Sequence, residues 1–339
     1  MQNWLRLIRY KNLLIVFLTQ LLVWYCLLYR NSFAVTMFNR NVSGSWTYVG
    51  ENMFLQDFKP FMLISLSTLL IAAAGYIIND YFDLKIDLIN RPTKMVLEQK
   101  IPMRTAIIAH TVLNIAGLAL AFIVARGMHH YELLAIQVIC SILLWFYSTH
   151  FKKQFITGNV VVAFLTALTI IMLAAYSPIT YLFLTLPSTV NNSLGYTYIN
   201  PLLMCLGYAV FAFMLTWMRE IVKDMEDYKG DAAEGCMTMP IKKGLQFSAR
   251  FAQLLGAITI IALAIISYFF FTDSYLILGI YTIALIVAPL IWWCVYIAKK
   301  NTIEHYASAS KWLKIIMLSG IASLIVYHFS IDLINCYGA

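Results

Sequence analysis

Long runs of apolar residues, separated by short polar segments, dominate the chain. A helix needs ~20 apolar residues to cross the hydrocarbon core of a bilayer, and nine runs reach or approach that length. These runs cover roughly 12–29, 60–78, 106–125, 131–148, 158–176, 201–218, 251–271, 275–297 and 312–330. The pattern predicts an all-α polytopic membrane protein, built as a bundle of nine transmembrane helices.

The composition supports lipid as the solvent for much of the chain. Of its 339 residues, 61% are hydrophobic and 12% are charged, and the mean hydropathy is +0.77. A soluble domain carries about 25% charged residues. No polar stretch is long enough to form a separate soluble domain, so we expect residues 1–339 to be a single membrane domain surrounded by membrane lipids.

The basic residues alternate with the apolar runs. If the N-terminus is cytoplasmic, the cytoplasmic segments carry 20 of the 24 Lys and Arg residues. The outer segments carry only Arg30, Arg40, Lys59 and Arg126. This bias follows the positive-inside rule and predicts an N-in, C-out topology. It also leaves no continuous basic patch, which argues against nucleic acid as a partner in spite of the net charge of +8.

Acidic residues are few, yet they gather in two segments. The first segment, NDYFDLKID, follows the second apolar run and extends from Asn79 to Asp87. If it is helical, Asn79, Asp83 and Asp87 lie at i, i+4 and i+8 on one face. The first segment therefore predicts a row of oxygen ligands on a helix at the end of a membrane span.

The second acidic segment follows the sixth apolar run and extends from Arg219 to Asp231. In a helix, Glu220, Asp224 and Asp227 share a narrow arc with Asp231. Gly230 is expected as a possible end of the helix before Asp231. With the predicted topology, both acidic segments leave the membrane on the cytoplasmic side.

Carboxylates that share one face repel each other unless cations offset their charge. Mg²⁺ prefers a few carboxylates, retained waters and a substrate phosphate, so two such clusters suggest metal ions that bridge a diphosphate. A single acidic cluster would be interpreted as loop charges exposed to water, without a metal ion. A transporter is disfavoured because the middles of the apolar runs carry almost no ionisable residues.

The two segments resemble the signatures of the UbiA superfamily of intramembrane prenyltransferases. NDYFDLKID is similar to the NDxxDxxxD motif of that superfamily, and DYKGD, from Asp227 to Asp231, is similar to its second DxxxD motif. The resemblance implies a helical bundle with a lateral opening to lipid and Mg²⁺-dependent transfer of a prenyl group from a prenyl diphosphate. It also implies that Mg²⁺ and the diphosphate are held by Asn79, Asp83, Asp87, Asp227 and Asp231, supported by Asp80 and Asp224.

Basic side chains are expected to complete the site, because a leaving diphosphate needs its charge stabilised. Arg9 precedes the first span at a position where the superfamily contacts diphosphate. Lys152 and Lys153 resemble the basic pair that follows the fourth span in the superfamily, and Lys153 is the expected catalytic member. Arg91 and Lys94 are further candidates for substrate binding.

The acceptor of the prenyl group is less constrained. REIVKDMED, from Arg219 to Asp227, resembles the REIxKDIED pattern of digeranylgeranylglyceryl-phosphate synthases, a branch that transfers geranylgeranyl to geranylgeranylglyceryl phosphate. Residues 95–99 depart from that branch, so an aromatic acceptor of quinone biosynthesis and a cyclase without an acceptor stay open as alternatives. A bacterial source would place the enzyme in the inner (cytoplasmic) membrane with its active site on the cytoplasmic side.

Overall fold

The structure is a computed structural model that describes residues 2–29, 53–90, 95–177, 201–272, 275–300 and 302–337. Every regular element among these residues is helical, and nine helical stretches are long and apolar enough to cross a membrane. The predicted all-α fold and the nine spans are therefore confirmed. Arg91 and Lys94 lie outside the described residues.

The spans are carried by long helices, two of which contain a π-helical segment. They are α2 (Tyr10–Leu22) with η1 (Val23–Tyr29), α4 (Met53–Phe82), α6 (Met103–Met128), α7 (Leu134–Thr149) after the short η3 (Tyr131–Leu133), α8 (Thr157–Ala175), α11 (Pro201–Glu226), α14 (Leu245–Thr272), α15 (Leu276–Thr282) with η5 (Ile283–Val287) and α16 (Ala288–Ile297), and α17 (Ile303–Tyr337). Most spans extend beyond the predicted apolar run by one to several residues, because polar residues at the ends of a run also take helical geometry, while the fifth and eighth spans match the predicted bounds to within one residue.

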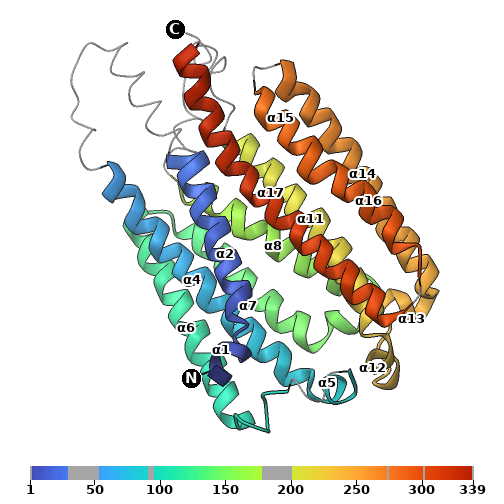
Figure 1. Ribbon diagram of the computed structural model, residues 1–339. Coiled ribbons are helices and arrows are strands. Elements are labelled where there is room, and N and C mark those ends of the chain that lie inside the picture. The colour runs from blue at the N-terminus through green and yellow to red at the C-terminus, as the bar shows by residue number, and fades with distance from the viewer. Residues whose placement is uncertain are drawn as a thin grey trace.

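Short helices gather at one end of this bundle. They are α1 (Gln2–Leu7), α5 (Leu84–Asn90), η4 (Phe151–Lys153), α12 (Tyr228–Ala233) and α13 (Met239–Lys243). Figure 1 shows α1, α5 and α12 at the same end as the N-terminus, with the C-terminus at the opposite end. The two acidic segments therefore meet at one end of the bundle, while the orientation of that end in a membrane stays a prediction.

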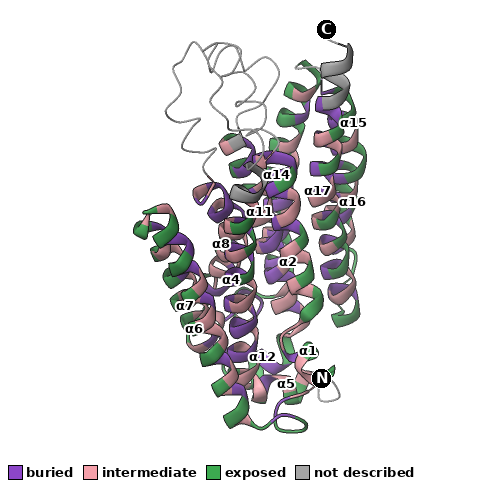
Figure 2. Cartoon of the chain, turned by 90° about the vertical axis from the view of Figure 1, so that its left-hand side faces the viewer, coloured by how far each residue is buried: buried purple, intermediate pink, exposed green. Residues whose placement is uncertain are grey.

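The interior holds the small and bulky apolar side chains, and the outer face is apolar as well. Helix α4 packs along α6, and α11 packs against α8 and α17. On α6, Ile108, Val112 and Ile115 are about three-fifths exposed and lie on one face. Figure 2 shows such exposed residues along the outside of the bundle. Apolar outward faces of this extent are stable only against lipid, so the chain is an integral membrane protein.

Candidate active site

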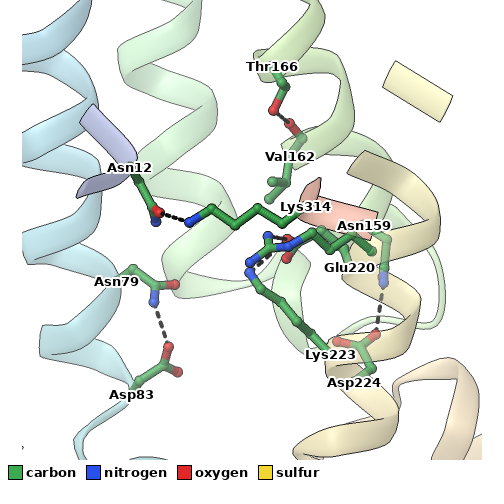
Figure 3. Close-up of polar contacts among 11 residues, drawn as sticks. Asn12, Asn79, Asp83, Asn159, Val162, Thr166, Glu220, Lys223, Asp224 and Lys314 are labelled. Atoms are coloured by element: carbon green, nitrogen blue, oxygen red, sulfur yellow. Dashed lines mark hydrogen bonds and ion pairs between the residues drawn. The ribbon is translucent and has the colours of Figure 1, made fainter. Parts of the chain in front are cut away.

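The first acidic segment continues the helix of the second span with one interruption. Helix α4 ends at Phe82 and α5 begins at Leu84, so Asp83 lies at the junction. The Asp83 backbone N–H still donates to the Asn79 carbonyl at 3.0 Å, and that of Asp87 donates to the Asp83 carbonyl at 2.8 Å. The predicted row of Asn79, Asp83 and Asp87 is thus preserved in the backbone, and the Asn79 side-chain amide donates to Asp83 Oδ2 at 2.7 Å (Figure 3).

The second acidic segment is broken at a different place from the one expected. Helix α11 ends at Glu226, Asp227 lies at the break, and α12 begins at Tyr228. The expectation that Gly230 ends the helix before Asp231 is wrong, because Gly230 and Asp231 both lie inside α12. The break turns α12 so that it packs against α5 of the first segment.

Asn90 joins the two segments. Its Nδ2 donates to the carbonyl oxygen of Asp227 at 3.2 Å, and its Oδ1 accepts from the backbone N–H of Gly230 at 3.0 Å. A Cβ at Gly230 would overlap the Asn90 amide, within 2.8 Å of Oδ1. A larger residue here would have to displace the Asn90 side chain and break its two hydrogen bonds to the second segment. Only its place beside the first motif distinguishes Asn90 in the sequence, which does not predict this role.

We expect Gly230→Ala to misalign the two acidic segments, because the new methyl group and the Asn90 amide cannot occupy the same space. A shift of about 1 Å at a reacting centre costs on the order of 10²-fold in rate, and we expect a loss of prenyl transfer of that size. Asn90→Ala opens the space, so the double variant should lose less than the two single losses combined. Gly127→Ala, where a Cβ meets no atom within 4 Å, is the matched control, and an equal loss there would contradict the assignment.

Carboxylates of both segments face each other where the two acidic segments meet. Asp231 is 8% exposed. Its burial, together with the negative charges of Asp227 and Asp83, raises the pKa of the Asp231 carboxyl to about 7. Lys152 acts on the same carboxyl with the opposite sign. Asp83 of the first segment and Asp227 and Asp231 of the second are thus within electrostatic reach of one another.

The donors at this junction fit Mg²⁺ that binds together with a phosphate-bearing ligand. The described residues contain no group of three or more His, Cys, Asp or Glu side chains placed to hold a metal ion by themselves. The Oδ1 atom of Asn79 is nevertheless buried and accepts no hydrogen bond from the described residues. Asn79 Oδ1 is thus a buried acceptor without a donor in the described part of the chain, next to carboxylates that repel each other. Such a set of oxygens suits Mg²⁺, which binds one or two carboxylates together with waters and substrate phosphates.

The raised pKa of Asp231 predicts a pH-dependent affinity for Mg²⁺. A metal ligand must be deprotonated, and the neutral form of Asp231 predominates below about pH 7 in the metal-free protein. We expect the Kd for Mg²⁺ in the presence of a prenyl diphosphate to fall as the pH rises from 6 to 8. Asp231→Asn should weaken binding and flatten this profile. Titration calorimetry at three pH values measures both, and an unchanged slope in the variant would contradict the assignment.

Of the two basic residues after the fourth span, Lys152 is the one in the site. The Lys152 side chain is 9% exposed and forms an ion pair with Asp83. Lys153 is exposed, and its hydrogen bonds are made by the backbone: its N–H donates to the His150 carbonyl at 3.3 Å, and its carbonyl accepts from the N–H of Met237 at 2.7 Å. The sequence predicts Lys153 as the catalytic member of the pair. The structure brings Lys152 rather than Lys153 to the first acidic segment, because the 3₁₀ turn of η4 directs successive side chains apart, and the catalytic role of Lys153 stays a prediction.

Arg9 lies between α1 and α2 in the left-handed region of the backbone, with φ 50°. A non-glycine residue there costs about 1–3 kcal/mol and persists where surrounding contacts enforce it. The Arg9 guanidinium donates to Asp80 at 2.6 Å and lies over the Tyr76 ring, 5.1 Å from its centroid. The break between the helices thus directs Arg9 toward the first acidic segment, while its predicted contact with diphosphate stays a prediction.

Asp224 of the second segment is oriented by a residue that the sequence did not point to. The Asn159 amide of α8 donates to Asp224 Oδ2 at 2.9 Å (Figure 3). Asn159 itself is 6% exposed. A polar residue in the first turn of an apolar span is a weak signal, which only the packing of α8 on α11 makes specific.

A cavity of about 300 Å³ extends from this polar end into the bundle. Arg9, Asn79 and Tyr147 line its polar end. Apolar side chains from α2, α4, α7, α8, α11 and α17 line the rest, among them Val16, Ile71, Leu144, Leu165 and Leu324. An apolar cavity with polar groups gathered at one end matches a molecule with a charged head and a long hydrocarbon tail.

Comparisons with known proteins agree with this geometry. A digeranylgeranylglyceryl phosphate synthase of Saccharolobus solfataricus is 32% identical over 279 residues, which cover 82% of this chain and 88% of the relative. One of Methanosphaera stadtmanae is 31% identical over 264 residues, covering 77% and 85%.

Solved structures of this fold cover almost the whole chain. A structure of digeranylgeranylglyceryl phosphate synthase aligns with a TM-score of 0.58 and 24% identity over 96% of this chain and 98% of that one. A UbiA homolog from Archaeoglobus fulgidus bound to GPP and Mg²⁺ aligns with a TM-score of 0.55 and 16% identity over 95% and 99%. Residues 43–336 match the UbiA prenyltransferase family. The chain therefore belongs to the UbiA prenyltransferase family and is a prenyltransferase of membranes.

Proposed function

We propose that the protein transfers a geranylgeranyl group, in a Mg²⁺-dependent reaction, from geranylgeranyl diphosphate to the free hydroxyl of geranylgeranylglyceryl phosphate. The observation that carries the proposal is the meeting of two acidic segments at the polar end of an apolar cavity. In the site proposed, Asn79, Asp83 and Asp87 face Asp227 and Asp231 across the diphosphate. Mg²⁺ held by these residues would supply positive charge to the leaving oxygens.

The chain's own residues account for the remaining requirements of the reaction. Arg9 and Lys152 hold fixed positive charge next to the first acidic segment, where it stabilises the charge that develops on the departing diphosphate. The rings of Tyr76 and Tyr147 line the cavity beside them and present aromatic faces to a developing allylic cation. The surrounding helices exclude water, which would otherwise capture that cation.

The bond changes are those of a substitution at the first carbon of the donor. The bond between that carbon and the diphosphate oxygen breaks, and its electron pair leaves with the diphosphate. A lone pair of the acceptor hydroxyl forms the new ether bond, and the hydroxyl proton is released to solvent or to the diphosphate. The products are inorganic diphosphate and an ether lipid.

The choice of acceptor is supported by the relatives and by the second motif. Relatives at 30–33% identity are digeranylgeranylglyceryl phosphate synthases from archaea. REIVKDMED lies on α11 and its end, beside the cavity, with Arg219, Glu220 and Lys223 in the lining. Placement in a bacterial inner membrane with a cytoplasmic site stays a prediction from the charge bias, and these relatives are archaeal.

Product mass spectrometry tests the proposal. Purified protein in lipid is incubated with geranylgeranyl diphosphate, Mg²⁺ and one of four additions: geranylgeranylglyceryl phosphate, 4-hydroxybenzoate, dihydroxynaphthoate, or no acceptor. We expect a Mg²⁺-dependent mass gain of one geranylgeranyl group on the glyceryl phosphate alone. Transfer only to an aromatic acid would overturn the acceptor, and a product formed without acceptor would indicate a cyclase.

A further inference from the structure

A second group of charged residues lines the same cavity, at the start of the second acidic segment and on α17. Arg219, Glu220 and Lys223 lie on one face of α11, and Lys314 reaches the cavity from α17. Glu220 is 7% exposed and accepts from Lys223 Nζ at 2.7 Å and from Arg219 Nη1 at 3.2 Å. One carboxylate thus orients two cations toward the cavity.

Lys314 adds a third cation to this wall without a carboxylate of its own. Its Nζ donates to the Asn12 amide oxygen on α2 at 3.0 Å, and the described residues place no Asp or Glu within ion-pair distance of it. Figure 3 shows the side chain extending across from α17 to Asn12, with Glu220 and Lys223 of α11 nearby. Lys314 and Arg219 are close enough for their charges to repel. A lysine is costly in this position unless an anion joins it.

Two buried polar atoms on the same face of α11 also lack a partner. Thr216 is 4% exposed, and its Oγ1 makes no hydrogen bond to the described residues. The Nε–H of Arg219 is buried and likewise unpaired within the described part of the chain. Buried donors of this kind are almost always satisfied. Both residues line the cavity, so a ligand in the cavity can satisfy them.

The donor diphosphate does not account for this surplus of positive charge. In the proposed reaction, it lies between the acidic segments, where Asp80 and Asp83 are already matched with Arg9 and Lys152. The wall of α11 and α17 instead has three basic residues and one carboxylate. Arg9 acts electrostatically on Glu220, so the two charged groups are close neighbours in one cavity. The arrangement suits two separate anions held near each other.

We propose that Arg219, Lys223 and Lys314 form a subsite for the phosphate of the acceptor lipid. This inference rests on the proposed function and names the residues that select a phosphorylated acceptor. The guanidinium and ammonium groups donate charge-assisted hydrogen bonds to the phosphate oxygens, and the Thr216 hydroxyl adds a neutral donor. Binding the phosphate here holds the acceptor hydroxyl next to the first carbon of the donor, which lies at the acidic segments.

Lys314→Met tests the subsite, because Lys314 is the cation whose removal leaves no carboxylate unpaired. We expect the KM for geranylgeranylglyceryl phosphate to rise about 10- to 100-fold, the effect of one lost charge-assisted hydrogen bond. The KM for geranylgeranyl diphosphate and the KM for unphosphorylated geranylgeranylglycerol should each change less than about twofold. Lys314→Arg should restore most of the affinity. Lys311→Met, on the exposed side of the same helix, is the matched control.

A wild-type experiment covers the case in which Lys314→Met does not fold. Glycerol 1-phosphate should inhibit competitively against the phosphorylated acceptor and not against the donor. In excess EDTA, the wild type should still bind geranylgeranylglyceryl phosphate in equilibrium dialysis, because the subsite contains no metal.

The outcomes separate the subsite from the reaction itself. Wild-type transfer with an unchanged acceptor KM in Lys314→Met would overturn the subsite and leave the proposed function standing. Competition of glycerol 1-phosphate against the donor would also overturn it, since the phosphate would then occupy the diphosphate site. Absence of wild-type transfer to either glyceryl acceptor would overturn the proposed function and the subsite together.

Discussion

Asp83→Asn should lower kcat/KM for prenyl transfer by about 10³-fold or more, because it removes a charge that both metal binding and the position of Lys152 depend on. Asp83 sits at the junction of α4 and α5, accepts from Asn79, and forms an ion pair with Lys152. Asparagine keeps the shape of the side chain, so the loss reports charge rather than packing. Asp227→Asn, from the opposite segment, should give a loss of the same order.

The controls for this prediction are folding and an acidic residue elsewhere. Both variants should elute from size exclusion in detergent as the wild type does and should retain its thermal unfolding temperature within a few degrees. Glu132→Ala, with a side chain 67% exposed at the start of the fourth span, should transfer at the wild-type rate. Full activity of Asp83→Asn would contradict the assignment of the first segment.

Lys152→Met should lower kcat by about 10²- to 10³-fold, the typical effect of removing one group that stabilises a developing negative charge. Its ammonium group is the buried cation nearest to Asp83, and its positive charge also reaches Asp231 of the opposite segment. Because the leaving diphosphate gains charge as the bond breaks, the effect should fall on kcat more than on the donor KM. Steady-state kinetics with the donor varied at saturating acceptor measures both.

Lys153→Met is the matched control for Lys152→Met. It removes the same charge one residue away, from an exposed side chain, and we expect a loss below about threefold. Lys152→Arg should recover part of the activity, because it restores the charge with a different shape. A large loss in Lys153→Met with little in Lys152→Met would return the catalytic role to the residue that the sequence alone predicts.

The membrane-spanning architecture could be predicted from the sequence because lipid imposes a simple length requirement. Each of the nine apolar runs became a span, and even the fourth, which contains Gln137, is helical. Gln137 is tolerated because it is 2% exposed and faces the interior, where its amide donates to the Met172 sulfur. The meeting of the acidic segments also followed from the even number of spans, the third to the sixth, that lie between the two segments along the chain.

The finer geometry of the site depends on contacts between segments that are distant in sequence. The hydrophobic pattern and the motifs of each segment do not predict these contacts. The helix breaks at Asp227 rather than at Gly230, and Gly230 lies inside α12, where Asn90 from another helix approaches it closely. Lys152 and Lys153 are equivalent in sequence and differ only in the direction imposed by η4. Lys314 resembles any basic residue at the end of a span until α17 places it in the cavity.

Binding of a non-reactive donor analogue tests the central claim, that the two acidic segments together form a metal-dependent diphosphate site. The measurement is the Kd of geranylgeranyl S-thiolodiphosphate for the detergent-purified protein, with Mg²⁺ and with EDTA, for the wild type, Asp83→Asn and Asp227→Asn. The account predicts tight binding by the wild type with Mg²⁺ and a loss of at least about 10²-fold in EDTA or in either variant. Equal affinity in EDTA and in both variants would contradict it, because the diphosphate would then bind without either segment.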